Sequence, residues 1–333
     1  MKTATPHFFT LSRPIRPTWC RTMLALVMLA LFTTLSCQAQ DVIPLLLTTK
    51  FSPGASDCDH NPPPPLEIRQ FDATTYVLRE SLCVTDEAPF MYLIIGSTRA
   101  LLIDTGDVAD PKKMPLAQTV LRLLPAKAGL TLPLLVAHSH RHSDHREGDV
   151  QFRGLPNVEV IGHDIDSVKT YFGFVDWPNG EAHIDLGGRI VDVIPTPGHN
   201  ETHVAFYDRT TALVFSGDFL MPGRLLINDK QADLASARRM AAFASQHLVS
   251  YVLGGHVEIN DAGETFSWGA TMHANEHVLP LTKKDLMALP EAVEHFNHFY
   301  THYGSFIMQD QLFVPPFLTL AAPDSLVLLG STH

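Results

Sequence analysis

Cysteine is scarce in this chain of 333 residues and is absent after residue 83. The four cysteines are Cys20, Cys37, Cys58 and Cys83. Any metal site beyond residue 83 must therefore use ligands other than thiolate. The sequence offers one such ligand in quantity, because it contains 18 histidines.

Positive charge is also in short supply. The chain has 24 lysines and arginines against 35 aspartates and glutamates, which gives a formal net charge of −11. Nucleic acids and anionic membranes are bound largely through Lys and Arg, so the composition argues against both partners and leaves a small molecule. Hydrophobic residues make up 45% of the chain and charged residues 18%, which indicates a globular protein with a large core.

The N-terminal segment has the pattern of an export signal. Residues 1–22 contain four basic residues and no acid, and an apolar run, 23–35, follows them. This run is shorter than the roughly 20 residues that cross a bilayer as a helix. We therefore predict a signal peptide over 1–39 and an exported protein, periplasmic or secreted. Two alternatives remain open, namely lipidation at Cys37 and an uncleaved leader that anchors the chain in the membrane.

Residues 40–73 are predicted to form an extended lead-in. The proline run at 61–66 fits neither a helix interior nor a central strand. Cys58 and Cys83 both lie after the leader. In an oxidising compartment they would pair as a disulfide, and the alternative is two free thiols.

From residue 74 onward, short apolar runs bounded by glycine or polar residues alternate with stretches of helical spacing. Strands are predicted at 74–80, 90–96, 100–106, 133–139, 158–164, 189–199, 203–208, 212–218 and 250–256, and helices at 111–128, 232–248 and 281–302. This order fits a two-sheet α/β sandwich better than a strictly alternating parallel sheet.

Four polar clusters each follow a predicted buried strand. They are the segment AHSHRHSDHREGD at 137–149 and the sequences TPGH, SGD and GGH, which end at His199, Asp218 and His256. Strand ends at one edge of a sheet bring together residues that are far apart in sequence, and sites are commonly assembled there. Imidazole and carboxylate without thiolate suit Zn²⁺ and also Fe or Mn.

The order of these clusters resembles the metallo-β-lactamase superfamily, whose signature is His-x-His-x-Asp-His. A start at His138 places a serine where the last histidine belongs, whereas a start at His140 fits every position up to His145. The sequence LIDTG at 102–106 also matches an upstream element of the family. The resemblance implies a four-layer αββα sandwich, with a catalytic domain over 74–276 and a C-terminal helical extension over 277–333.

The resemblance also implies a ligand set for two metal ions. His140, His142 and His199 would hold one ion, Asp144, His145 and His256 would hold the other, and Asp218 would bridge the two. The ions, two Zn²⁺ or alternatively Fe or Mn, would share a hydroxide that serves as the nucleophile. Asp144 would act as the catalytic residue that orients this hydroxide and passes a proton to the leaving group.

Several nearby residues have two interpretations. His138 lies outside the signature and is expected to pack or to support the ligands, and Asp104 either ends a strand or supports a ligand. Arg141 either meets a substrate carboxylate or is simply solvated. The aromatic residues at 172–177 either wall a pocket or pack on one another.

The function implied by the resemblance is hydrolysis of a small ester, lactone, thioester or amide by an exported binuclear metal enzyme. Two other activities remain open, a mononuclear iron sulfur dioxygenase and a β-lactamase. β-Lactam hydrolysis is disfavoured, because one branch of those enzymes needs a cysteine ligand and the other lacks the aspartate found here at Asp218. A non-catalytic binding protein is disfavoured by the complete ligand set.

Overall fold

The structure, a computed structural model, describes residue 1 and residues 49–127 and 130–310. The predicted signal peptide and the lipidation alternative at Cys37 therefore lie outside the described residues. Every element below belongs to the unit Leu46–His333. In the part of the chain that the structure describes, none of the helices has the length and apolar character needed to cross a bilayer.

The first of two six-stranded sheets has the strand order β1-β2-β3-β4-β7-β8. The first four strands pair antiparallel, and β4, β7 and β8 pair parallel. The strands are β1 (Leu66–Asp72), β2 (Thr75–Glu80), β3 (Phe90–Ile95), β4 (Ala100–Ile103), β7 (Leu134–Ala137) and β8 (Val158–Val160).

The second sheet has the order β15-β14-β12-β11-β10-β9. All its neighbours are antiparallel except β12 and β14, which run parallel. The strands are β9 (Ala182–Asp185), β10 (Ile190–Pro195), β11 (Val204–Asp208), β12 (Leu213–Gly217), β14 (Tyr251–Gly254) and β15 (Pro280–Leu281).

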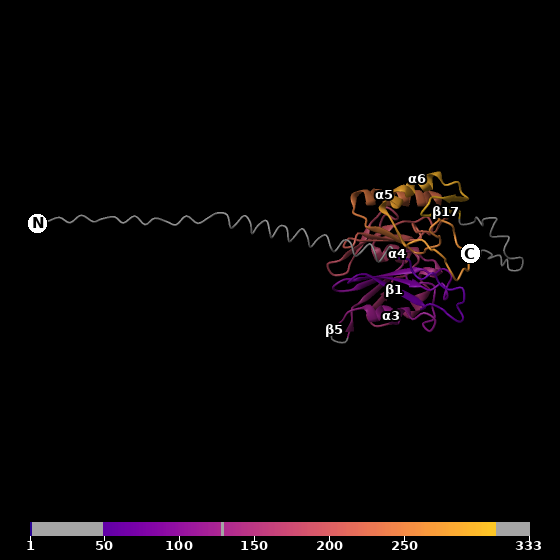
Figure 1. Cartoon of the computed structure of the whole chain (residues 1–333). Coiled ribbons are helices and arrows are strands. Elements are labelled where there is room, and N and C mark those ends of the chain that lie inside the picture. The colour runs from indigo at the N-terminus through magenta and orange to yellow at the C-terminus, as the bar shows by residue number, and fades with distance from the viewer. Residues whose placement is uncertain (2–48, 128–129, 311–333) are drawn as a thin grey trace. The chain divides into compact units, whose positions relative to one another are not determined.

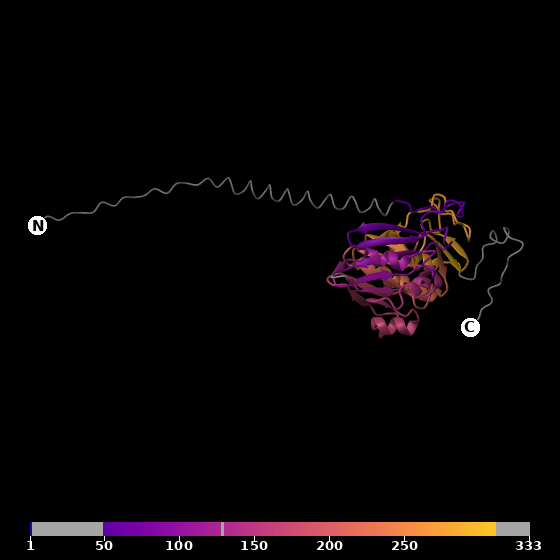
Figure 2. The same ribbon diagram turned by 90° about the horizontal axis from the view of Figure 1, so that it is seen from below.

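Smaller elements complete the fold. A three-stranded sheet contains β13 (Arg224–Ile227), β17 (Ile307–Asp310) and β16 (Tyr300–His302), and a two-stranded sheet contains β5 (Ala126–Lys127) and β6 (Leu130–Thr131). The helices are α3 (Leu116–Leu123), α4 (Ile165–Phe172), α5 (Lys230–Gln246) and α6 (Lys283–His295), with the short 3₁₀ turns η1 (Ser143–His145) and η2 (Glu147–Gln151). In Figure 2, α4 lies at the margin of the sandwich.

Helices cover the outer faces of both sheets (Figure 1). Leu116 and Val120 of α3 belong to one buried cluster with Leu102 of the first sheet. Met240 of α5 and Leu286 of α6 belong to a second cluster, which also contains strand residues of the second sheet. Burial of these apolar faces explains why the chain adopts helix, sheet, sheet and helix layers, and the predicted αββα sandwich is confirmed.

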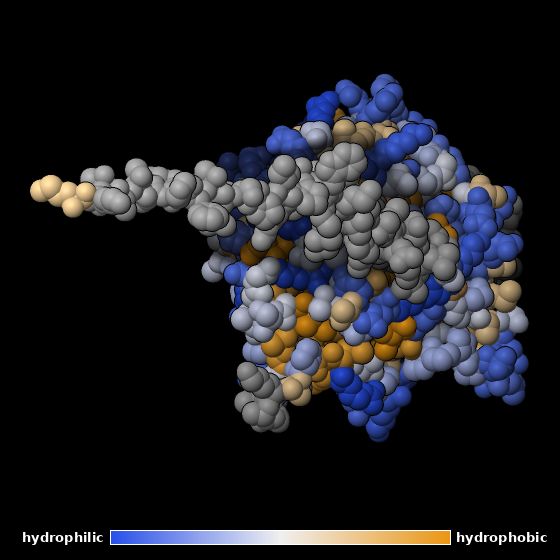
Figure 3. Space-filling view, turned by 60° about the vertical axis from the view of Figure 1, so that its left-hand side comes forward, coloured by the Kyte–Doolittle hydropathy of each residue, from blue (hydrophilic) through white to orange (hydrophobic). Residues whose placement is uncertain are grey.

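The outer surface is mostly hydrophilic on the face shown in Figure 3, with one hydrophobic area on its lower half.

The inner faces of the two sheets pack on each other. The rings of Tyr92 and Phe215 lie 4.7 Å apart between the sheets, and the Tyr92 hydroxyl donates to the carbonyl of Gly254. All residues of β3 and β12 are buried, because both faces of each central strand are covered. The sheets are joined again where the amide of Phe90 donates to the carbonyl of Gly255, 2.8 Å away.

Three parts of the fold differ from the sequence-based expectation. The predicted lead-in ends in β1, which pairs with β2 and forms an edge of the first sheet. The described part of the expected C-terminal helical extension contains α6 but also β15, β16 and β17, and β15 continues the second sheet. The helix expected at 111–128 begins only after Pro115, because a proline in a helix interior removes a hydrogen bond and clashes with the preceding turn.

Cys58 and Cys83 form a disulfide with their Cα atoms 5.3 Å apart. The disulfide ties residues before β1 to the loop between β2 and β3. That loop leads to Glu87, whose backbone carbonyl accepts a hydrogen bond from His256 at 2.8 Å. The covalent link therefore lies four residues from a contact with the site described next.

Candidate metal centre

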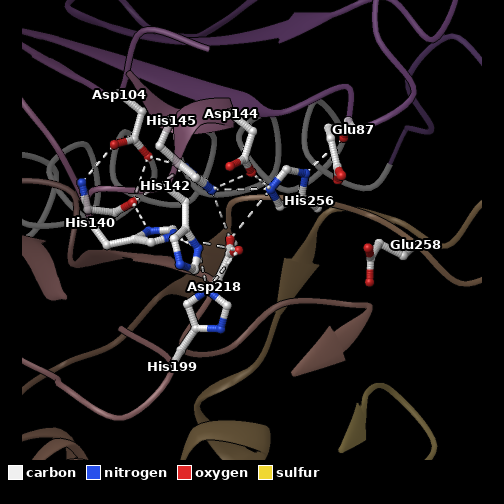
Figure 4. Close-up of polar contacts among 12 residues, drawn as sticks. Glu87, Asp104, His140, His142, Asp144, His145, His199, Asp218, His256 and Glu258 are labelled. Carbon is white, nitrogen blue, oxygen red and sulfur yellow. Dashed lines mark hydrogen bonds and ion pairs between the residues drawn. The ribbon is translucent and has the colours of Figure 1, made fainter. Parts of the chain in front are cut away.

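Two groups of histidines and aspartates meet where strands of both sheets end (Figure 4). Within each group, one potential ligand atom from every residue lies within 4.8 Å of the others. The first group is His140, His142 and His199, and the second is Asp144, His145, Asp218 and His256. The seven residues come from the segments that follow β7, β10, β12 and β14, as the sequence predicts.

The ring nitrogens of the first group surround one point. Nδ1 of His142 lies 2.9 Å from Nε2 of His140 and 3.1 Å from Nε2 of His199. His140 and His199 are buried, whereas His142 is partly exposed. Three converging imidazoles with one open side match the ligand set of a catalytic zinc site.

The second group combines two carboxylates with two imidazoles. Oδ2 of Asp144 lies 3.1 Å from Nε2 of His145 and 3.2 Å from Nε2 of His256. The two Nε2 atoms lie 3.2 Å apart. The Asp144 side chain is 18% exposed, while those of His145 and His256 are buried, so Asp144 is the group that solvent and small molecules can approach.

Asp218 lies between the two groups. Its Oδ1 is 3.3 Å from Nε2 of His145 and 3.6 Å from Nε2 of His256. Its Oδ2 is 3.6 Å from Nε2 of His199 and 3.9 Å from Nε2 of His140. One carboxylate thus presents one oxygen to each group, which is the arrangement expected of a bridging ligand.

Three histidines are oriented by hydrogen bonds on the far side of their rings. Nδ1 of His145 lies 3.0 Å from Oδ2 of Asp104, Nδ1 of His199 lies 3.0 Å from the carbonyl of Leu226, and Nδ1 of His256 lies 2.8 Å from the carbonyl of Glu87. These bonds use the Nδ1–H of each ring and direct Nε2 at the centre, where a metal ion would take its lone pair, as in known histidine ligands.

The electrostatics of the two groups differ. Burial, together with the neighbouring His199, lowers the pKa of His142 to about 4. Burial also lowers the pKa of His140 well below its usual range. Both rings are therefore neutral at pH 7 and available as ligands. Burial acts in the same direction on His256, but the carboxylates of Asp218 and Asp144 outweigh it and raise its pKa to about 10.

The site fits divalent metal ions. Oδ1 of Asp218 is buried and accepts no well-aligned hydrogen bond in the described part of the chain, and its nearest positive charges are the rings of His145 and His256 at 3.3 and 3.6 Å. A buried carboxylate oxygen of this kind is stabilised by a cation.

Two neutral imidazoles, of His140 and His142, and the oriented ring of His199 converge in the first group. In the second group, the protonated rings of His145 and His256 balance the carboxylates. A metal ion would replace those protons.

The other residues considered from the sequence lie outside the two groups. Nε2 of His138 lies 2.8 Å from Oδ1 of Asp149, so it packs beside the ligand loop. Arg141 pairs with Glu201 at 2.7 Å, with both side chains largely exposed. Phe174 lies between Phe172 and Trp177 at ring distances of 5.9 and 5.4 Å, which shows that these aromatics pack on one another.

Sequence reasoning missed the supporting carbonyls of Glu87 and Leu226. Every residue has a backbone carbonyl, so no side-chain pattern could have singled these two out. Asp104 was considered, and the structure places its carboxylate on His145 and also on the amide of Ser139, at 2.7 Å.

Comparison with known proteins gives one family. Residues 84–256 match the family model described as the Metallo-beta-lactamase superfamily. A hydroxyacylglutathione hydrolase of Aeromonas hydrophila is 29% identical over 165 residues, which are 48% of this chain and 59% of that protein. A protein of the same name from Synechococcus is 32% identical over 135 residues, 40% of this chain and 50% of that protein. The chain thus spans about half the length of the curated relatives it matches.

Solved structures give similar neighbours. A metallo-beta-lactamase from Pontibacter korlensis has 15% sequence identity and a TM-score of 0.47, with 69% of this chain and 100% of that chain covered. A metallo beta lactamase from Erythrobacter litoralis has 15% identity and a TM-score of 0.48, with 70% and 97% covered.

Proposed function

This chain belongs to the metallo-β-lactamase superfamily, whose model matches residues 84–256, and we propose that it is a binuclear metal-dependent hydrolase. The substrate class is a small ester, lactone, thioester or amide. The observation that carries the proposal is the position of Asp218, whose two oxygens face two separate groups of ligands.

We propose two zinc ions as the resident cofactors, with iron or manganese as alternatives. The first group would hold one ion, the second group the other, and Asp218 would contribute to both. When bound, the ions would lower the pKa of water and polarise a carbonyl oxygen of the substrate.

Asp144 is the residue proposed to move the proton. Burial raises the pKa of its carboxyl, but the adjacent His145 and His256 outweigh that effect and keep it well below the usual range. The ionised carboxylate can accept a proton from the attacking water and pass it to the leaving group. Its side chain is partly exposed, so the attacking water and the leaving group of the substrate can both reach it.

The complete second group favours a hydrolase over the mononuclear alternative. A mononuclear iron dioxygenase would need only a subset of these residues, whereas here all four members of the second group converge within 4.8 Å. Thioesters belong in the substrate class because the relatives reported above are named hydroxyacylglutathione hydrolases.

We also propose that the protein is exported. The pattern of residues 1–39 supports this, and so does the Cys58–Cys83 disulfide, because disulfides persist mainly in oxidising compartments.

A substrate panel tests the proposed activity. Zinc-loaded protein is assayed on lactones, thioesters, aryl esters, β-lactams and phosphodiesters, beside His142→Ala and Asp144→Ala. Turnover of at least one ester, lactone or thioester is expected, with a loss of 100-fold or more in both variants. His183→Ala, at an exposed position of β9, is the control that should retain activity. Equal turnover in the wild type and in both site variants would overturn the assignment.

A further inference from the structure

Helix α5 packs beside the TPGH loop, the four residues that end at His199. In Figure 1, α5 lies with α6 on the outer face of the second sheet. Pro197 has no backbone N–H, so the loop has few donors of its own and depends on its neighbours. Oγ of Ser236, in α5, donates to the carbonyl of Pro197 at 2.7 Å. The amide of Asp229, the N-cap of α5, donates to the carbonyl of Gly198 at 3.1 Å. The backbone just before His199 is therefore attached to α5.

Asp233, in the first turn of α5, lies against the same loop. The residue is 4% exposed, and burial raises the pKa of its carboxyl well above the usual range, although a hydrogen bond from the backbone amide of His199 acts in the opposite direction. A Cβ atom on Gly198 would lie 2.1 Å from Oδ1 and 2.7 Å from Cα of Asp233. No side chain fits between loop and helix, so the absence of one at Gly198 lets the carboxyl reach the backbone next to His199.

The buried carboxyl is unfavourable for the packing of the helix alone. Oδ2 of Asp233 has no hydrogen-bond partner in the parts of the chain that the structure describes. A buried polar atom without a partner costs free energy, so an apolar residue would suit this position better if packing were its only role. The carboxyl instead provides an acceptor for the amide of His199. This contact indicates a role in the loop rather than in the helix.

We propose that Asp233 is a positioning residue for His199, whose main chain it fixes so that the ring points at the first group. The ring itself is oriented separately, because its Nδ1 donates to the carbonyl of Leu226 at 3.0 Å. A ligand that is held at both its backbone and its ring is pre-organised for a metal ion. The inference rests on the proposed metal site. It predicts an effect on the first ion alone, since the second group has its own support, such as the contact of Asp104 with His145.

Zinc affinity tests this role without requiring turnover, and competition with a chromophoric chelator measures it. In a His256→Ala background, which leaves the first group intact, Asp233→Ala should lower the affinity by 10-fold or more. In a His142→Ala background, which leaves the second group intact, the same change should lower it by less than about 2-fold. A residue that only stabilises the fold would act alike in both backgrounds. Equal losses, or no loss in either background, would overturn the proposal.

Two further variants examine the hydrogen bond itself. The side-chain oxygen of Asp233→Asn can still accept from the His199 amide, so this variant should retain the affinity of the wild type within about 3-fold. A loss in Asp233→Asn as large as in Asp233→Ala would overturn the role of the acceptor. If thermal unfolding shows that Asp233→Ala does not fold, Asp233→Leu takes its place with the same expected outcomes, because it also lacks an acceptor. Glu291→Ala, at an exposed position of α6, is the matched control and should leave the affinity unchanged.

Turnover separates this inference from the proposed hydrolase function. In the otherwise unchanged protein, Asp233→Ala should lose ester, lactone or thioester turnover at limiting zinc and regain it in excess zinc, while Asp233→Asn keeps it at both concentrations. Zinc binding that depends on Asp233, without hydrolysis of any substrate, would support the positioning role and remove the hydrolase function. Hydrolysis that Asp233→Ala sustains at limiting zinc would keep the hydrolase function and overturn the positioning role.

Discussion

Nδ1 of His145 lies 3.0 Å from Oδ2 of Asp104, while Nε2 of the same ring lies 3.1 Å from Asp144. Asp104 also accepts from the amide and the hydroxyl of Ser139, at 2.7 and 2.9 Å. Its carboxylate thus fixes the ring of one proposed ligand and the backbone next to another, His140.

Replacement of Asp104 tests this support. Asp104→Asn is the suitable change, because the residue has a φ of 65°, which asparagine tolerates better than alanine. The amide has one acceptor oxygen for contacts that now occupy two, so we expect zinc affinity to fall by about 10- to 100-fold. Competition with a chromophoric chelator measures the affinity. Asp185→Asn, at an exposed position of β9, is the control, and equal affinities in both variants would show that Asp104 is dispensable.

The protonation of the second group predicts that both the stability of the metal-free protein and its affinity for zinc depend on pH. Carboxylates raise the pKa of His256 to about 10 in the folded protein without metal, against about 6.5 in an unfolded chain. The stability from this protonated ring is complete below about pH 6.5 and is lost as pH rises through 10. Zinc uptake at pH 8 should therefore release protons, and affinity should increase with pH over this range. Calorimetry in two buffers of different ionisation enthalpy counts the protons, and zinc binding without proton release would contradict the account.

Gly217 precedes Asp218 in a conformation that a side chain would disrupt. Its φ is 48°, and a Cβ atom would lie 2.6 Å from Cβ of Ser139 and 2.9 Å from Nε2 of His203. Gly217→Ala should displace Asp218, the proposed bridging ligand, and reduce both metal content and thermal stability.

Gly154→Ala is the control for the Gly217 variant. Gly154 has a φ of 78° but no atom within 4 Å of the added Cβ, so only conformational strain of about 1 kcal/mol is expected. Metal analysis and thermal unfolding compare the two variants. A Gly217→Ala protein with full metal content would show that the crowding around Asp218 is unimportant.

The Cys58–Cys83 disulfide closes a loop with a sequence separation of 25. A loop of this length predicts a loss of about 3 kcal/mol in the free energy of unfolding when both cysteines become serine. Thermal unfolding with and without a reductant measures this. The double variant should have the same melting temperature as the reduced wild type. If no reductant changes the melting temperature of the wild type, the two thiols are unpaired in solution.

Much of the site follows from local spacing. The His-x-His-x-Asp-His pattern that begins at His140 selects residues that the structure brings together, because such a pattern consists of residues close to one another in sequence. Their role as metal ligands stays a prediction. The same spacing excludes His138, which pairs with Asp149 instead. The contact of the Glu87 carbonyl with His256 could not be predicted, since it joins residues far apart in the chain.

The fold could be predicted in its layers but not at its margins. Central strands such as β3 are apolar throughout, which makes them visible in the sequence. β1 reads LEIRQFD, with polar residues on an edge strand that is only partly buried, and it was therefore missed as part of the sheet. The strands β16 and β17 were hidden within a segment expected to be helical, because strands this short leave little periodicity.

The most direct measurement of the central claim is the number of zinc ions bound per chain by the wild type and by Asp218→Asn. Equilibrium dialysis followed by elemental analysis gives both values, and ester, lactone or thioester turnover is recorded on the same samples. The account predicts two ions per wild-type chain, the loss of at least one in Asp218→Asn, and a fall in turnover of 100-fold or more. A single ion in the wild type, or two ions and full turnover in Asp218→Asn, would contradict the claim that Asp218 bridges a binuclear centre.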